Sequence, residues 1–144
     1  MSSRDNNLGW FLSMRWAMIF LFAAGLIMSV VFWLDLLTSK ALIEETSIVA
    51  TKIWEGLMFL GSFSGLLSTL NQKLRPTTQR RLEAMGCFGV GASWLIYSVS
   101  LLFSDGIPWV TVTMIGLPSI GLLIHSVVCL LIARKIARVS RGVE

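Results

Sequence analysis

The sequence has few of the residues on which enzyme active sites depend. Its 144 residues include one histidine, two cysteines and only 14% charged side chains. It contains no glycine-rich phosphate loop, no strained nucleophile turn and no histidine–glutamate metal-binding helix. For the two cysteines, Cys87 and Cys129, we expect no nearby second ligand, so they do not predict a metal site. We therefore predict a protein with no enzymatic activity, cofactor or metal.

The sequence is instead dominated by four long apolar runs. A hydrocarbon core of about 30 Å needs about 20 helical residues, whereas the helices of a soluble domain need a polar face. The first run continues well past Ala23-Ala24-Gly25, so we expect an uncleaved span rather than a signal peptide. We predict an all-α polytopic membrane protein, in which one domain forms an antiparallel bundle of four transmembrane helices. The predicted spans are 16–35, 52–70, 83–103 and 109–133, followed by a basic tail at 134–144.

Positive charge alternates between the segments that join these runs. Two basic residues precede the first run, four lie between the second and third, and four follow the fourth. The segment between the first and second runs has only Lys40 and Lys52, and the turn at 104–108 has none. Because basic residues in short loops stay cytoplasmic, we predict that both termini lie inside. The basic residues are split among short segments, so they indicate topology and inner-leaflet lipid, not nucleic-acid binding.

Tryptophans lie near the ends of the runs. Trp16 and Trp33 bracket the first run, Trp54 begins the second and Trp109 begins the fourth. Tryptophan is enriched at membrane–water interfaces. We therefore interpret these four residues as depth markers, and Trp94, in the middle of its run, as facing either lipid or the bundle.

Small residues mark the expected helix–helix contacts. Gly61, Gly65 and Thr69 recur every four residues in the second run, and glycines also gather early in the third. Such a ridge allows another backbone to approach closely. It predicts packing within a four-helix bundle or, alternatively, a contact between copies of the chain.

The fourth run contains the remaining candidate residues. Pro118 cannot donate a hydrogen bond to the carbonyl of Met114, so it predicts a kink or a gating hinge.

His125 is the only ionisable residue well inside a run, and such residues are functional candidates. Counting depth from the inner ends places serines, and no acid, opposite His125. We therefore expect a hydroxyl partner for it, with a proton- or ion-linked role as the alternative. Near the cytoplasmic face we expect the two cysteines to be buried thiols rather than a disulfide.

The order of these features resembles a known group of proteins. It comprises an Arg-Trp start, a Trp-led and glycine-rich second run, Arg81-Leu82-Glu83-Ala84-Met85-Gly86 opening the third, and Ala133-Arg134-Lys135-Ile136-Ala137-Arg138 closing the fourth. It resembles the small four-span membrane proteins of actinobacterial phages and prophages, some of which are proposed holins. The resemblance implies a protein of the bacterial inner membrane that acts by self-association as a homo-oligomer.

Two other functions stay open at this point. The chain is alternatively an accessory or regulatory protein that binds a larger membrane-protein partner. The third class is a small transporter or channel that uses His125.

Overall fold

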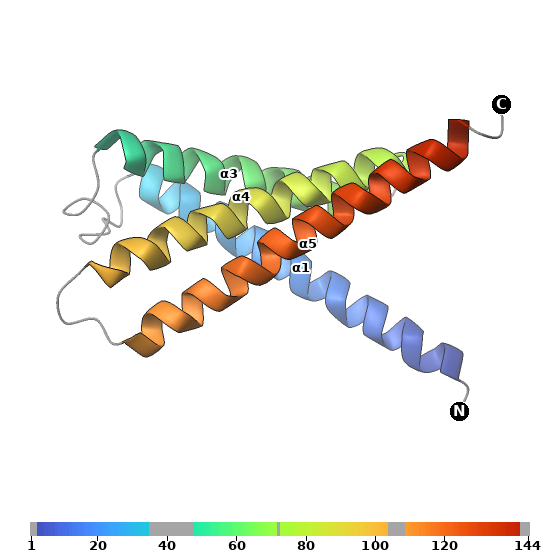
Figure 1. Ribbon diagram of the computed structural model, residues 1–144, viewed down its shortest axis with the longest axis horizontal. Helices are drawn as coiled ribbons and strands as arrows, with labels where there is room; N and C mark the ends of the chain where they lie inside the picture. The colour runs from blue at the N-terminus through green and yellow to red at the C-terminus, as the bar shows by residue number, and fades with distance from the viewer. Residues whose placement is uncertain (1–2, 35–47, 72, 104–108, 142–144) are drawn as a thin grey trace.

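The computed structural model describes residues 3–34, 48–71, 73–103 and 109–141, with side chains from residue 15 onward except those of residues 48 and 50. These residues form four helices and no strand (Figure 1). The predicted 104–108 turn and most of the segment between the first two runs lie outside the described residues. The helices are α1 (Ser3–Trp33), α3 (Ile48–Leu70), α4 (Pro76–Leu102) and α5 (Trp109–Arg141).

All four helices are long and apolar enough to cross a membrane, which agrees with the predicted membrane class. The candidate spans are Arg15–Trp33, Thr51–Leu70, Pro76–Leu102 and Trp109–Ser140. α4 begins seven residues before the predicted third span because Pro76 occupies its first turn, where a missing N–H costs nothing and φ is already helical. α5 continues through eight residues of the predicted basic tail, to Arg141.

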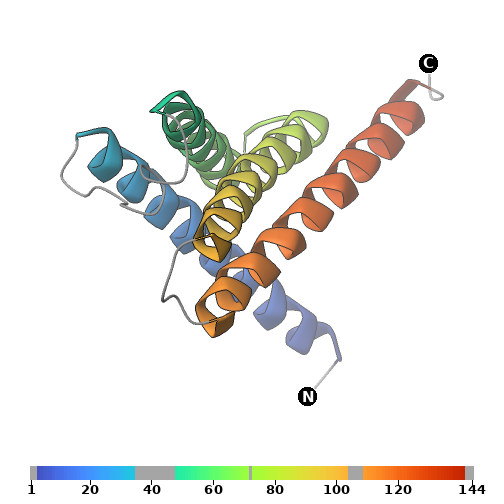
Figure 2. The same cartoon turned by 60° about the vertical axis from the view of Figure 1, so that its left-hand side comes forward.

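The helices pack in chain order as an open row. Among the described residues, close contacts join α1 to α3, α3 to α4 and α4 to α5, with a small contact between α1 and α4. α3 and α4 run in opposite directions, since Gly61 of α3 lies against Gly89 of α4 while Gly65 lies against Gly86 (Figures 1 and 2). Within the described ranges α1 and α5 share no close contact, so each lies at one edge of the row.

Glycines allow α3 and α4 to approach closely. A Cβ atom added at Gly89 would lie 2.6 Å from the Cα of Gly61 and 2.7 Å from the carbonyl oxygen of Leu57. A Cβ atom at Gly65 would lie 2.5 Å from the ring of Phe22, which is fully buried. The glycine ridge predicted from the sequence therefore packs inside this chain, against α4 on one side and α1 on the other.

Small polar residues fill much of the interior and link the helices. Nine of the serines that the structure describes are buried, and several donate to the backbone of their own helix, as Ser68 does to Gly65. Others donate to a neighbour: Ser98 Oγ to the Val112 carbonyl at 2.9 Å, and Ser126 Oγ to the Ala84 carbonyl at 2.9 Å. Such contacts suit membrane helices, which associate through close packing and hydrogen bonds rather than through hydrophobic burial.

Trp54 is the one predicted depth marker that the structure corrects. Its side chain is only 3% exposed, and its indole N–H donates to the Ser93 carbonyl at 2.7 Å. Its ring packs edge-on against Phe32 of α1 and near Tyr97 of α4. Trp54 therefore ties three helices together, whereas the other three marker tryptophans (Trp16, Trp33 and Trp109) are exposed.

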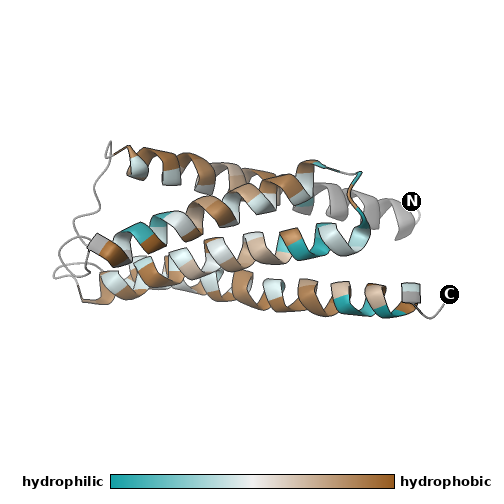
Figure 3. Ribbon diagram, turned by 90° about the horizontal axis from the view of Figure 1, so that it is seen from above, coloured by the Kyte–Doolittle hydropathy of each residue, from teal (hydrophilic) through white to brown (hydrophobic). Residues whose placement is uncertain are grey.

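The outer surface is apolar along the middle of the row. Figure 3 shows brown, hydrophobic ribbon over most of its length, with the largest hydrophilic stretches where α4 begins and α5 ends. Many large hydrophobic side chains are exposed there, including Phe20, Leu60, Phe88 and Leu117. In water such a surface would be unusually apolar, and in a bilayer it meets lipid.

Candidate functional site

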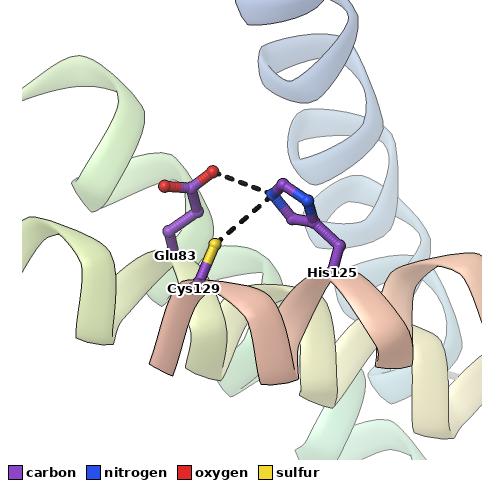
Figure 4. Close-up of side chains that lie close together, drawn as sticks. All are labelled: Glu83, His125 and Cys129. Carbon is purple, nitrogen blue, oxygen red and sulfur yellow. Dashed lines mark hydrogen bonds and ion pairs between the residues drawn. The ribbon is translucent and has the colours of Figure 1, made fainter. Parts of the chain in front are cut away.

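The clearest polar cluster lies between α4 and α5, and it corrects the environment predicted for His125. Glu83 of α4 places its carboxylate Oε1 3.1 Å from His125 Nε2 of α5 (Figure 4). The prediction that no acid lies at the depth of this histidine is therefore wrong. The hydroxyl partner expected for the ring is replaced by a carboxylate on the neighbouring helix.

The correction has a specific structural cause. The predicted third span began at residue 83, which placed Glu83 at the end of a helix and at the membrane surface. In the structure α4 begins at Pro76, so Glu83 lies two turns inside the helix. The Ser126–Ala84 hydrogen bond fixes the register, and it brings the preceding residues on the two helices, His125 and Glu83, together.

Cys129 completes the cluster from the same face of α5. It lies four residues after His125, a spacing that aligns side chains along one side of a helix. Its sulfur lies 3.4 Å from His125 Nε2. The thiol is buried, whereas 33% of the His125 side chain and 16% of the Glu83 side chain are exposed. The cluster is thus closed on its sulfur side and open on its histidine side.

Arg80 holds the other oxygen of the carboxylate. Its Nη1 donates to Glu83 Oε2 at 2.7 Å, from one turn earlier on α4. The two carboxylate oxygens therefore have different partners: Oε2 accepts from Arg80, and Oε1 faces His125. This arrangement fixes the plane of the carboxylate, as a second partner does for metal-binding carboxylates.

These three side chains also offer a metal-binding geometry. One ligand atom each from Glu83, His125 and Cys129 lies within 4.8 Å of the others. The expectation that Cys129 has no second ligand nearby is therefore wrong, because its partners come from one turn away and from another helix. Cys87, also buried and reduced, lies one turn after Glu83 on α4 and is not part of this group.

The other residues singled out from the sequence lie elsewhere. Gly61 and Gly65 are in the α3–α4 contact, and Thr69, on the same helix, donates to the Gly65 carbonyl at 3.0 Å. Arg15 Nη2 donates to the Thr69 carbonyl at 2.7 Å, which joins the beginning of the first span to the end of the second. Pro118 lies within the continuous helix α5, where the next residue, Ser119, donates its hydroxyl to the Ile115 carbonyl at 2.6 Å.

Comparison with known proteins gives no match to a family model, to a curated protein or to a solved structure. The fold itself is all-helical, with four helices that are long and apolar enough to cross a membrane. Its function must be argued from the arrangement of these four helices.

Proposed function

We propose that the chain is a four-span protein of the bacterial inner membrane, an antiparallel helix bundle with both ends on the cytoplasmic side. Support comes from the basic residues, which gather where α1 enters its span, between α3 and α4, and at the end of α5. These three places lie at one end of the row (Figure 1). The segments at the other end carry only two basic residues, and positive charge retained inside orients short-loop proteins.

The protein acts by self-association in the plane of the membrane, as a phage-type, holin-like protein without enzymatic activity. The observation that carries this proposal is the open row: within the described residues α1 and α5 share no close contact. In a closed bundle every helix packs against neighbours on both sides. A row has two free edges, so another copy of the chain can pack against an edge and extend it.

The surface for this association lies on α5 rather than on the glycine ridge. Gly61 and Gly65 are already covered by α4 and α1, so a second copy could reach them only by separating the helices. The free side of α5 instead carries exposed residues at alternating steps of four and three, the spacing of a helix–helix seam. They are Val110, Met114, Leu117, Gly121, Ile124, Val128 and Leu131.

A photo-crosslinking experiment tests this assignment. A photoreactive amino acid at Leu117 or Ile124 should give dimers and larger species after induced expression. The same group at Phe88, which is exposed on the central helix α4, should label lipid and give only monomer. Equal crosslinking from Phe88 would contradict an edge-to-edge assembly.

Cell lysis tests the holin-like role separately. Replacing Leu117 and Ile124 together by alanine should weaken the crosslinked ladder and delay lysis when an endolysin is present. The matched double variant Met85→Ala/Phe88→Ala, on the exposed side of α4, should change neither. A chain that assembles but never permeabilises the membrane would contradict the holin-like role and favour the alternative below.

The alternative is an accessory protein that binds a larger membrane partner. It is favoured by the end of α5, which stays helical to Arg141 and exposes Arg134, Lys135 and Arg138. Under this alternative, α5 would crosslink to one defined partner at equal stoichiometry, and the ladder of identical copies would not form.

A further inference from the structure

We propose that Glu83, His125 and Cys129 form a binding site for a zinc-class divalent metal ion between α4 and α5. This inference goes beyond the proposed self-association and does not depend on it. It rests on three ligand types that converge from two helices, with their ligand atoms mutually within 4.8 Å (Figure 4).

Two of the three distances between the ligand atoms are close to those of a tetrahedral site. Metal–ligand bonds of about 2.0–2.3 Å separate neighbouring ligand atoms by about 3.4–3.6 Å at tetrahedral angles. His125 Nε2 lies 3.1 Å from Glu83 Oε1 and 3.4 Å from Cys129 Sγ. To bind an ion, Glu83 Oε1 and Cys129 Sγ would each move away from His125 Nε2 by a few tenths of an ångström. The third pair, Oε1 and Sγ, lies within 4.8 Å.

The backbone holds the ligands in place. His125 and Cys129 are one turn apart on α5, and Glu83 is carried by α4, whose register is fixed next to the site by the Ser126–Ala84 hydrogen bond. Arg80 binds Glu83 Oε2 and leaves Oε1 toward the site. A bound ion would thus join two helices that are already aligned.

The donor set selects the type of ion. A thiolate, an imidazole and a carboxylate suit Zn²⁺ and Co²⁺, whereas Mg²⁺ and Ca²⁺ prefer oxygen ligands alone. The negative charges of the thiolate and the carboxylate oppose the two positive charges of the ion, although the Glu83 carboxylate also pairs with Arg80. Three protein ligands leave the fourth position of a tetrahedral ion for a further ligand.

Binding releases a proton. The Cys129 thiol gives up its S–H proton as the sulfur–metal bond forms, and no electron is transferred. In the same step the His125 ring binds the ion through its unprotonated Nε2 and gives up its contact with Glu83 Oε1. Affinity should therefore fall as pH decreases, because protons compete for both the sulfur and the imidazole nitrogen.

Cobalt titration of the purified full-length chain in detergent tests the site. Co²⁺ should bind with one ion per chain and give a thiolate-to-cobalt charge-transfer band, together with the intense visible bands of tetrahedral coordination. Zn²⁺ should remove both signals by displacement, and excess Mg²⁺ should not. A wild-type chain without a thiolate band at stoichiometric Co²⁺ would overturn the proposal.

Single substitutions identify the ligands. Cys129→Ser should abolish the charge-transfer band. His125→Ala and Glu83→Gln should each weaken binding by more than about tenfold. Tenfold is the lower end of the loss seen when a residue that only contacts a metal ligand is replaced, and losing a ligand itself should cost more. Cys87→Ser is the matched control, since it changes a buried thiol on the neighbouring helix outside the ligand group. Its affinity should equal that of the wild type.

Two controls keep the outcome interpretable. Each variant is first checked for wild-type helix content and a monodisperse elution profile, and Glu83→Gln preserves the shape of the side chain if His125→Ala does not fold. A charge-transfer band that persists in Cys129→Ser, or that disappears in Cys87→Ser, would overturn the assignment of these three ligands.

Discussion

Gly61 and Gly89 face each other across the α3–α4 interface with no room for a side chain on either. A Cβ atom at Gly61 would lie 2.8 Å from the Cα of Gly89, and the reverse distance is 2.6 Å. Backbone lies on both sides of this contact, so a neighbour cannot yield by changing rotamer. This close approach of the two backbones therefore depends on glycine at both positions.

Gly61→Ala should destabilise the chain by about 1–3 kcal/mol, the usual cost of overpacking a fitted interior. Gly56→Ala is the matched control on the same helix, because a Cβ atom there would meet nothing within 4 Å. It should be neutral or stabilising by up to about 1 kcal/mol, since alanine favours helix over glycine. Unfolding in mixed micelles measures both variants, and equal effects would contradict the close contact.

Glu83 and His125 should be energetically coupled in the absence of metal. A double-mutant cycle with Glu83→Gln and His125→Ala should give a coupling energy of about 1 kcal/mol, because interhelical polar contacts in membranes are modest and this one is partly exposed. The control cycle pairs Glu83→Gln with Ser98→Ala, which lies in the same interface but near its other end. Additive effects in the first cycle would contradict the contact.

Trp54 should contribute to stability through its N–H group. Trp54→Phe retains an aromatic ring but loses the 2.7 Å hydrogen bond to the Ser93 carbonyl, which leaves a buried acceptor with one partner fewer. The expected loss is about 1 kcal/mol. Trp109→Phe, at an exposed position, should change unfolding by much less, and a reversed order would restore the interpretation of Trp54 as a depth marker.

The sequence was sufficient to predict the helices but not how they align. Apolar runs of about 20 residues predict spans because few structures other than a helix satisfy the backbone in lipid. The ends were less predictable, since Pro76–Leu82 and Arg134–Arg141 are polar enough to lie outside the bilayer and still continue a helix. Hydropathy marks where a helix enters lipid, not where it begins.

The Glu83–His125–Cys129 cluster was missed for the same reason. A partner for His125 depends on the register between α4 and α5, which is fixed by individual contacts such as Ser126 with Ala84. The available signal was the polar start of the third run, in which Arg80 and Glu83 are one turn apart and form an ion pair. Extending that helix toward Pro76 would have placed Glu83 inside the interface.

Trp54 was misinterpreted because the position of a residue along a run does not indicate which side of the helix its side chain occupies. Its place at the beginning of a span is typical of the interfacial belt, but the same helical turn faces Phe32 and Ser93. Glu55, the next residue, is also buried and pairs with Lys52 at 2.8 Å. The N-terminal end of α3 is therefore part of the packed interior.

The central claim is that four helices cross the membrane with both ends of the chain in the cytoplasm. Single reporter cysteines, in a chain whose Cys87 and Cys129 are replaced by serine, measure this most directly when labelled in intact cells by a membrane-impermeant reagent. Reporters at Pro76 and Val143 should be protected until the cells are opened, and reporters at Thr46 and Gly106 should react from outside. Labelling of the Pro76 position in intact cells would contradict the orientation and the four-span arrangement.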